Sequence, residues 1–238
     1  QRQRRLATLG EMSAQIAHEI RNPLQKILTG VEYLRDYCEV KDSSVVDIVS
    51  KGVSSINLII SRMVEYGKPA ALDLKDVDIP DMLEEILSGS RDRLNLLKIE
   101  VVRDFPETVK VVLDPVRFKQ GIQNVIDNAV DAMREGGRLT LSMRYICEEN
   151  ERPSKVACKP VSPSSMLEIK VSDTGVGMDK EGVSKLFTPF YTTKVNGSGL
   201  GMAMVKKIAD LHKGEVFVKS EVGAGTEVTI RVPIQRLP

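Results

Sequence analysis

The amino-acid sequence predicts two different parts: an antiparallel pair of long helices, followed by an α/β sandwich. Three observations lead to this prediction. Apolar residues recur every three or four positions over 6–38 and again over 45–66, which is the period of an amphipathic helix. Glycine and proline interrupt the pattern at 66–76. From about residue 77 onward, short apolar stretches alternate with helical patterns, which indicates strands mixed with helices.

The composition excludes several classes of function. The chain has 238 residues and 34 basic against 33 acidic side chains, so no global field attracts nucleic acid or an anionic membrane. Cys38, Cys147 and Cys158 form no CxxC pair, which favours a reducing compartment. No apolar run approaches the roughly 20 residues of a membrane span. We therefore expect a cytoplasmic location, with no nucleic acid and no membrane contact.

The two helices predict a homodimer. Each carries a single apolar seam, and a lone hairpin cannot bury both seams, whereas two copies can form a four-helix bundle. We assign residues 1–67 to this domain, 68–76 to a linker and 77–238 to the α/β domain. The seams consist of Leu6, Leu9, Ile16, Ile20, Leu24, Ile27, Val31, Leu34 and Cys38 in the first helix, and of Val45, Val49, Ile56, Ile59, Met63 and Tyr66 in the second.

The α/β domain begins with a helix, and a long hairpin loop without periodicity at 148–165 separates two of its strands. In chain order, we expect a helix at 79–97, strands at 99–104 and 109–113, a helix at 115–135, strands at 139–146 and 167–171, a glycine-rich region, a helix at 200–212, and strands at 215–219 and 227–232.

A histidine in the stretch AHEIRNPL is predicted to face solvent. Ile16 and Ile20 lie on the inner seam, and His18 lies between them in sequence, about 180° away around the helix. Asn22 falls within about 40° of His18. A proline inside a helix costs about 3 kcal/mol, and packing within a bundle can support the kink at Pro23.

This outward imidazole suits nucleophilic catalysis. An exposed histidine titrates near pH 6.5, and the adjacent Glu19 can take its proton during attack. The chain has only two histidines. The other one, His212, is interpreted as an ordinary residue at a helix C-terminus, which disfavours a serine triad.

The helical pattern at 115–135 combines a buried face with a polar stripe. The stripe has two interpretations: a solvated surface, or amide oxygens offered to Mg²⁺, which takes few protein ligands. The apolar face consists of Phe118, Ile122, Val125, Ala129 and Met133, and the polar stripe of Asn124, Asn128 and Asp131.

Two glycine-rich stretches complete the candidate site. In SDTGVGM, Asp173 could accept a hydrogen bond from an exocyclic amine, and the glycines that follow allow a tight turn. In NGSGLGMAMVKKI, a glycine run directly precedes a helix, where backbone amides favour phosphate. Lys194 could add positive charge there. The absence of GxxxxGK[ST] excludes a P-loop.

Taken in order, the motifs HEIRNPL, NVIDNAVDAM, DTGVGM, LFTPFYTTK and GSGLGMAMVKKI closely resemble the H, N, G1, F and G2 boxes of two-component sensor histidine kinases, with the FTPFYTTK stretch similar to the nitrogen-regulation type. The resemblance implies a dimerisation and histidine phosphotransfer domain and a Bergerat-type catalytic domain that binds ATP and Mg²⁺. It also implies an upstream sensor domain, since the sequence begins with Gln1, and location on the cytoplasmic side of any membrane-bound sensor.

The resemblance also assigns roles to residues. His18 would receive the γ-phosphoryl group, Glu19 would act as acid/base, and Asn22 would orient water when a response regulator is dephosphorylated. Asn124 and Asn128 would hold Mg²⁺, and the receiver domain of a response regulator would take the phosphoryl group. The ATP site would comprise Asn124, Asn128, Asp131, Asp173, Gly175, Gly177, Lys194, Gly197, Ser198, Gly199, Leu200 and Gly201.

One departure and two alternatives remain open. Many relatives carry a basic residue where this chain has Asp131, so Lys194 or Arg134 is left to contact phosphate. A conformational ATPase of the gyrase and chaperone type would place a glutamate base at the position of Asn124 and would lack the HEIRNPL hairpin. A non-catalytic scaffold would dimerise without using ATP, although all the expected boxes are present.

Overall fold

The computed structural model describes residues 20, 24–25, 27–34, 43–67, 71–146, 165–194 and 197–234. The chain divides into two compact units. The first, the helical unit, comprises Gln1–Ala70 and Thr192–Leu200, and the second, the α/β unit, comprises Ala71–Tyr191 and Gly201–Pro238. The segment Thr192–Leu200, which holds most of the glycine run, is thus grouped with the helices. From the sequence, we assigned it to the α/β domain at 77–238. The domain boundaries themselves stay a prediction.

The described helices of the helical unit share a small apolar core. Residues 27–34 are helical, and α2 spans Ser43–Gly67. Spacings of four, seven and four place the contacting α2 residues on one stripe. The core consists of Leu24, Val53 and Ile60, with Leu28, Val49 and Val64 packed against it.

The expected seams share Leu24 and Val49 with this core and differ from it elsewhere. Ile20, which we placed on the inner seam, is 40% exposed, and Ile56 is 42% exposed, whereas the unexpected Val53 is buried. A helix in a bundle has two neighbours, and apolar spacing alone does not tell which stripe faces which neighbour. Apolar side chains exposed on this unit are Ile20, Ile27, Tyr33, Leu34, Ile48 and Ile56.

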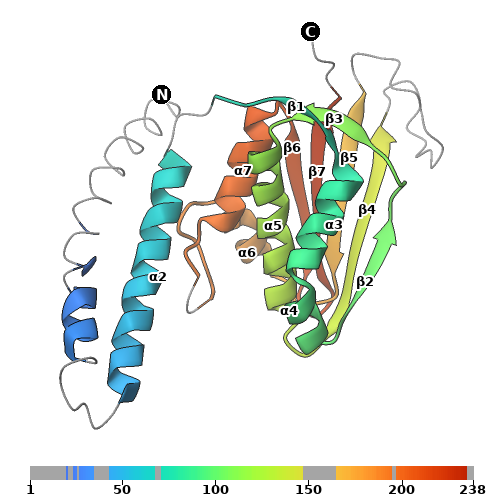
Figure 1. Ribbon diagram of the computed structural model, residues 1–238. Coiled ribbons are helices and arrows are strands. Elements are labelled where there is room, and N and C mark those ends of the chain that lie inside the picture. The colour runs from blue at the N-terminus through green and yellow to red at the C-terminus, as the bar shows by residue number, and fades with distance from the viewer. Residues whose placement is uncertain are drawn as a thin grey trace. The chain divides into compact units, whose positions relative to one another are not determined.

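The α/β unit contains the remaining elements (Figure 1). They are β1 (Lys75–Asp78), α3 (Ile79–Gly89), α4 (Arg91–Leu96), β2 (Ile99–Asp104), β3 (Lys110–Leu113), α5 (Pro115–Ala132), β4 (Gly137–Ile146), β5 (Met166–Asp173), α6 (Lys180–Lys185), α7 (Gly201–Leu211), β6 (Glu215–Glu221) and β7 (Gly225–Pro233).

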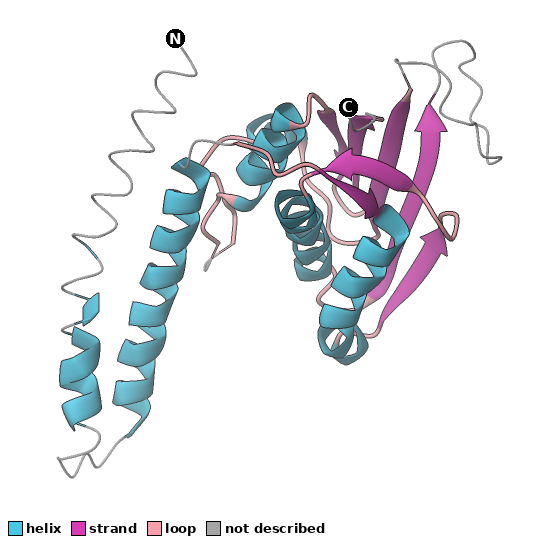
Figure 2. Ribbon diagram, turned by 45° about the horizontal axis from the view of Figure 1, so that its top comes forward, coloured by secondary structure: helices cyan, strands magenta, loops and turns pink. Residues whose placement is uncertain are grey.

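Five strands form one mixed sheet in the order β2-β4-β5-β7-β6, in which only β2 and β4 pair in parallel. Helices α3, α5 and α7 lie on one face of this sheet, as the turned view shows (Figure 2). A second ladder of two antiparallel strands joins β1 to β3. This is the expected α/β sandwich.

Helix α5 forms as the sequence predicts. The Asp114 carboxylate accepts a hydrogen bond from the backbone N–H of Arg117, and Pro115 occupies the first turn, where it costs no hydrogen bond. The predicted apolar face is buried throughout, which confirms it. Its members are Phe118, Ile122, Val125, Ala129 and Met133.

Three short features differ from the predicted elements. The helix expected at 79–97 is two helices, because the backbone of Ser90, with φ −100° and ψ 1°, leaves the helical conformation and ends α3. β1 begins at Lys75, inside the expected linker. The six-residue α6, capped by Asp179, was not predicted, since one turn and a half carries no periodicity.

Candidate functional site

Three candidate residues lie outside the described part of the chain. These are His18, Glu19 and Asn22. Their proposed catalytic roles and the outward orientation of His18 stay predictions. The orientation assumes that Ile20 lies on the seam of a dimeric bundle, and its exposure in the single chain does not test that position.

Asp173 lies at the end of β5 with 9% of its surface exposed. Burial raises the pKa of its carboxyl group, while hydrogen bonds from the backbone N–H groups of Gly175 and Thr226 work against that rise. The Gly175 bond measures 2.8 Å. A buried carboxylate held by its own backbone in this way can offer a directed acceptor to an amine.

The loop after Asp173 requires glycine for two separate reasons. Gly177 has φ +65°, and a Cβ there would lie 1.9 Å from the carbonyl oxygen of Glu221. A Cβ on Gly175 would lie 2.6 Å from the carbonyl oxygen of Ala132, at the end of α5. The loop therefore packs directly against α5 and the β6–β7 turn, and the site has no room for side chains there.

Asn124 extends from α5 toward the start of α7. A Cβ built on Gly201, the first residue of α7, would lie 3.7 Å from the Asn124 Oδ1 atom. The amide oxygen of Asn124 therefore lies beside a helix N-terminus, where backbone amides attract phosphate. Asn128 follows one turn later on α5, and both asparagines are half-buried.

Asp131, the third member of the predicted polar stripe, forms an ion pair with Arg93 of α4. Arg93 also bonds the Oδ1 atom of Asp127 at 3.3 Å. Through this ion pair, Asp131 connects α5 to α4, so at least one residue of the polar stripe has a structural role. The role of Asp131 in binding a cofactor stays a prediction.

The described part of the glycine run forms tight turns. The Lys194 N–H donates to Thr192 Oγ1 at 3.1 Å, and the Gly197 N–H donates to the Lys194 carbonyl at 3.1 Å. A Cβ on Gly197 would lie 2.2 Å from Thr192 Oγ1, and Gly199 has φ +66°. Ser198 Oγ accepts from the Leu200 N–H at 3.4 Å. This run precedes α7 as predicted.

His212 contradicts our interpretation of it as an ordinary helix-end residue. It is 5% exposed, its Nε2 atom accepts a hydrogen bond from the Asp114 N–H at 3.0 Å, and its ring packs edge-on against Phe118. Asp114 is equally buried. Sequence reasoning missed both residues, because their partners lie far away along the chain.

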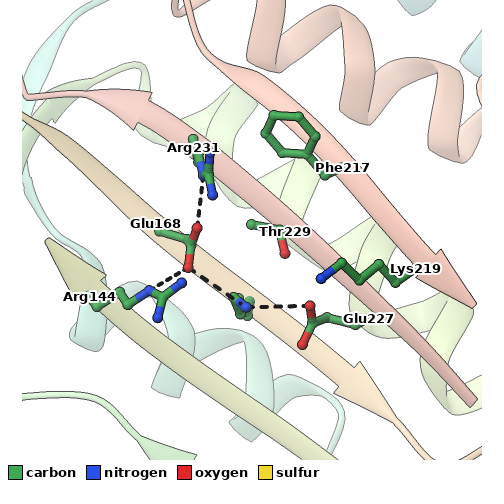
Figure 3. A pocket seen from close by; sticks show the side chains of 8 residues that line it. Arg144, Glu168, Phe217, Lys219, Glu227, Thr229 and Arg231 are labelled. Atoms are coloured by element: carbon green, nitrogen blue, oxygen red, sulfur yellow. Dashed lines mark hydrogen bonds and ion pairs between the residues drawn. The ribbon is translucent and has the colours of Figure 1, made fainter. Parts of the chain in front are cut away.

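A second cluster of charged side chains lies on the sheet (Figure 3). Glu168 of β5 is fully buried between Arg144 of β4 and Arg231 of β7, its direct cross-strand neighbours, at 2.6 and 2.8 Å. Burial favours the neutral acid, but the bonds from both arginines outweigh it and lower the Glu168 pKa. Opposite charges thus face each other across β4, β5 and β7, and these cross-strand pairs stabilise the sheet.

The side chains near the start of α7 limit which metal ion could bind there. In the described residues, no group of three or more His, Cys, Asp or Glu side chains could hold one. Magnesium retains several waters and binds through few protein oxygens together with substrate phosphates. The amide of Asn124 beside the start of α7, with Asn128 one turn later on α5, fits such a shared site. Among the described helices, none combines the length and the apolarity of a membrane span.

Comparison with protein families identifies both parts of the chain. Residues 113–236 match the family described as histidine kinase-, DNA gyrase B-, and HSP90-like ATPase, and residues 8–72 match the His Kinase A (phospho-acceptor) domain. The chain therefore belongs to the two-component histidine kinases and carries their phospho-acceptor and ATPase domains.

Individual relatives agree with this assignment. Sporulation kinase D of Bacillus subtilis is 34% identical over 235 residues, covering 97% of this chain and 43% of that protein. The chain thus spans less than half of that relative. The fold resembles full-length ShkA in complex with AMPPNP, with a TM-score of 0.70 at 24% identity over 94% of this chain and 46% of that one. It also resembles the kinase ThkA in complex with the response regulator TrrA, with a TM-score of 0.67 at 23% identity over 99% of this chain and 64% of that one.

Proposed function

We propose that this chain is the catalytic core of a sensor kinase, which transfers the γ-phosphoryl group of ATP to His18 and then to an aspartate of a response regulator. The observation that carries the proposal is the Asn124 amide oxygen beside the first residue of α7, in a chain whose His Kinase A domain contains His18. The conformational ATPase lacks support, because Asn124 is no general base. The complex of ThkA with the response regulator TrrA supports the proposal that a response regulator is the partner.

The residues would divide the work as follows. Asp173 would accept a hydrogen bond from the adenine amine, and the amides at the start of α7, with Lys194, would bind phosphate. Bound Mg²⁺, held through Asn124 and Asn128, would neutralise phosphate charge. His18 would attack the γ-phosphorus as ADP leaves, while Glu19 takes the imidazole proton.

The same proposal includes the partners. We infer a homodimer, because Ile20, Ile27, Leu34, Ile48 and Ile56 leave an apolar face on the helical unit. A second copy of this unit would bury that face in a four-helix bundle. Asn22 would support dephosphorylation of the regulator, a sensor domain would lie upstream, and the location would be cytoplasmic.

Incubation with Mg²⁺ and γ-labelled ATP tests the proposal. We expect acid-labile, base-stable labelling of the chain, abolished by His18→Ala without loss of ATP affinity in calorimetry. Asp173→Asn keeps the side-chain volume but turns an amide donor toward the adenine amine, so labelling should fall together with ATP affinity. Phosphate release without labelled protein would favour the conformational ATPase, and neither product would favour the scaffold.

A further inference from the structure

Three segments of the α/β unit meet at Asp114, between β3 and α5. Its carboxylate Oδ2 atom accepts a hydrogen bond from the backbone N–H of Asp73 at 3.1 Å, while Oδ1 accepts from the Arg117 N–H at 3.0 Å. Its own N–H donates to His212 Nε2 at 3.0 Å. One buried residue thus joins the segment before β1, the start of α5 and the end of α7.

His212 fastens the end of α7 to this junction. Its Nδ1 atom lies 2.8 Å from the Ile208 carbonyl oxygen. Since Nε2 accepts from Asp114, the ring proton resides on Nδ1 and is donated to Ile208. Both ring nitrogens are therefore engaged in the neutral form, and the Phe118 ring packs against the imidazole with centroids 5.6 Å apart.

From Asp73 onward, hydrogen bonds attach the segment 73–78 to the rest of the α/β unit. β1 pairs with β3 from Lys75 opposite Leu113 to Asp78 opposite Lys110. The Asp73 bond to Asp114 continues this ladder toward the N-terminus by means of a side chain. The backbone N–H of Asp73 thus connects the segment before β1 to the buried start of α5.

We propose that Asp73, Asp114 and His212 form a clamp that positions the α/β unit for phosphoryl transfer. The clamp sits at one end of α5 and α7, the two helices that carry Asn124 and Gly201. It ties the segment that follows the helical unit in the chain to the helices of the ATP site. Phosphoryl transfer requires close alignment of the reacting atoms, so a loosened clamp slows the transfer step without weakening ATP binding. This inference rests on the proposed function.

A matched pair at Asp73 tests the clamp. Asp73→Pro removes the N–H that Asp114 accepts, while Asp73→Ala keeps that donor and removes only the exposed ion pair with Lys75. At saturating ATP we expect the Pro variant to label His18 roughly fivefold more slowly than the Ala variant, with ATP affinity equal within about twofold. Labelling at the Ala rate, or a parallel loss of ATP affinity, would overturn the clamp.

Asp114→Asn provides a second variant in case the proline disturbs folding. Asparagine caps a helix as well as aspartate does, and the backbone donor to His212 remains. One of the two accepting oxygens becomes an amide donor, so we expect the same slowing and faster hydrogen exchange of the Asp73 N–H. Unchanged exchange at Asp73 would refute the clamp even if wild-type protein forms no phosphohistidine, an outcome that would refute the proposed function instead.

Discussion

The two units bury their apolar side chains in different ways. The α/β unit closes a core between its helices and its sheet, where Leu83, Phe118, Ile122, Leu139 and Ile169 are each no more than 1% exposed. In the helical unit, the buried core within the described residues is Leu24, Val53 and Ile60. Several isoleucine side chains of this unit remain exposed, namely Ile20, Ile27, Ile48 and Ile56. The α/β unit closes its core within a single chain, whereas the helical unit leaves exposed the apolar face that the proposed homodimer would bury.

This contrast has an energetic reason. Burying an isoleucine or leucine side chain contributes about 1.5–3 kcal/mol, and two helices have only one contact stripe between them. A sheet covered by several helices buries both elements at once. In the proposed homodimer, the helical unit would gain stability by burying this face, whereas the α/β unit already buries its core within one chain.

The largest effect is expected for Glu168→Ala. Glu168 is fully buried between Arg144 and Arg231, and removing one member of a buried ionic group costs about 3–5 kcal/mol. Hydrogen exchange with mass spectrometry can follow each unit separately. Exchange should accelerate in β4, β5 and β7 and stay unchanged in α2. The control Glu100→Ala, at the exposed ion pair with Arg138, should cost no more than about 1 kcal/mol. Equal acceleration in α2 would mean that the units unfold together.

A smaller effect, in the opposite unit, is expected for Ile56→Asp. Ile56 is 42% exposed on α2, and burying a charge at a dimer interface should weaken association at least roughly tenfold. The thermal transition of the α/β unit should not move. Val222→Asp, in the exposed turn between β6 and β7, serves as the control. Sedimentation at several concentrations measures the dissociation constant, and identical values for Ile56→Asp and wild type would remove this stripe from the interface.

Periodicity predicted the elements that bury one face over several turns. The apolar face from Phe118 to Met133 was predicted residue by residue, because the 18-residue α5 repeats its apolar spacing over several turns. β1 was missed, because Lys75–Asp78 contains only one apolar residue and exists through its pairing with β3. The break at Ser90 likewise depends on the local backbone conformation and not on apolar spacing.

The candidate site was predictable where a motif carries it, and unpredictable where tertiary contacts decide. Asp173 and Gly177 were found from DTGVGM, and the steric need for glycine at residue 177 is set by the Glu221 carbonyl. His212 was misjudged, because its partner is a backbone N–H 98 residues away. Asp131 was assigned without Arg93, since nothing in the sequence brings α4 and α5 together.

The smallest effect is a pH dependence confined to the α/β unit. Burial lowers the pKa of His212 below its ordinary value, although the Ile208 carbonyl and Asp114 favour the charged form and Arg117 adds to the lowering. Unfolded histidine, near pKa 6.5, therefore binds a proton more readily than the folded form does. Stability is fully present above pH 6.5 and decreases as the pH falls toward the folded pKa, by at most about 1.4 kcal/mol per pH unit.

The comparison of wild type with His212→Gln isolates this titration. Asp173, whose pKa is raised by burial, acts in the opposite direction, because its folded form holds the proton more tightly. That contribution is common to both proteins and cancels in the difference. The pKa values of Asp114 and Glu168 are lowered, so their stabilisation is lost only at more acidic pH. Between pH 7.5 and about 5.5, urea unfolding of wild type should show the additional slope and the variant should not. Parallel curves would mean that His212 takes up a proton as readily in the folded protein as in the unfolded chain, which is incompatible with its acceptance of the Asp114 N–H in the clamp.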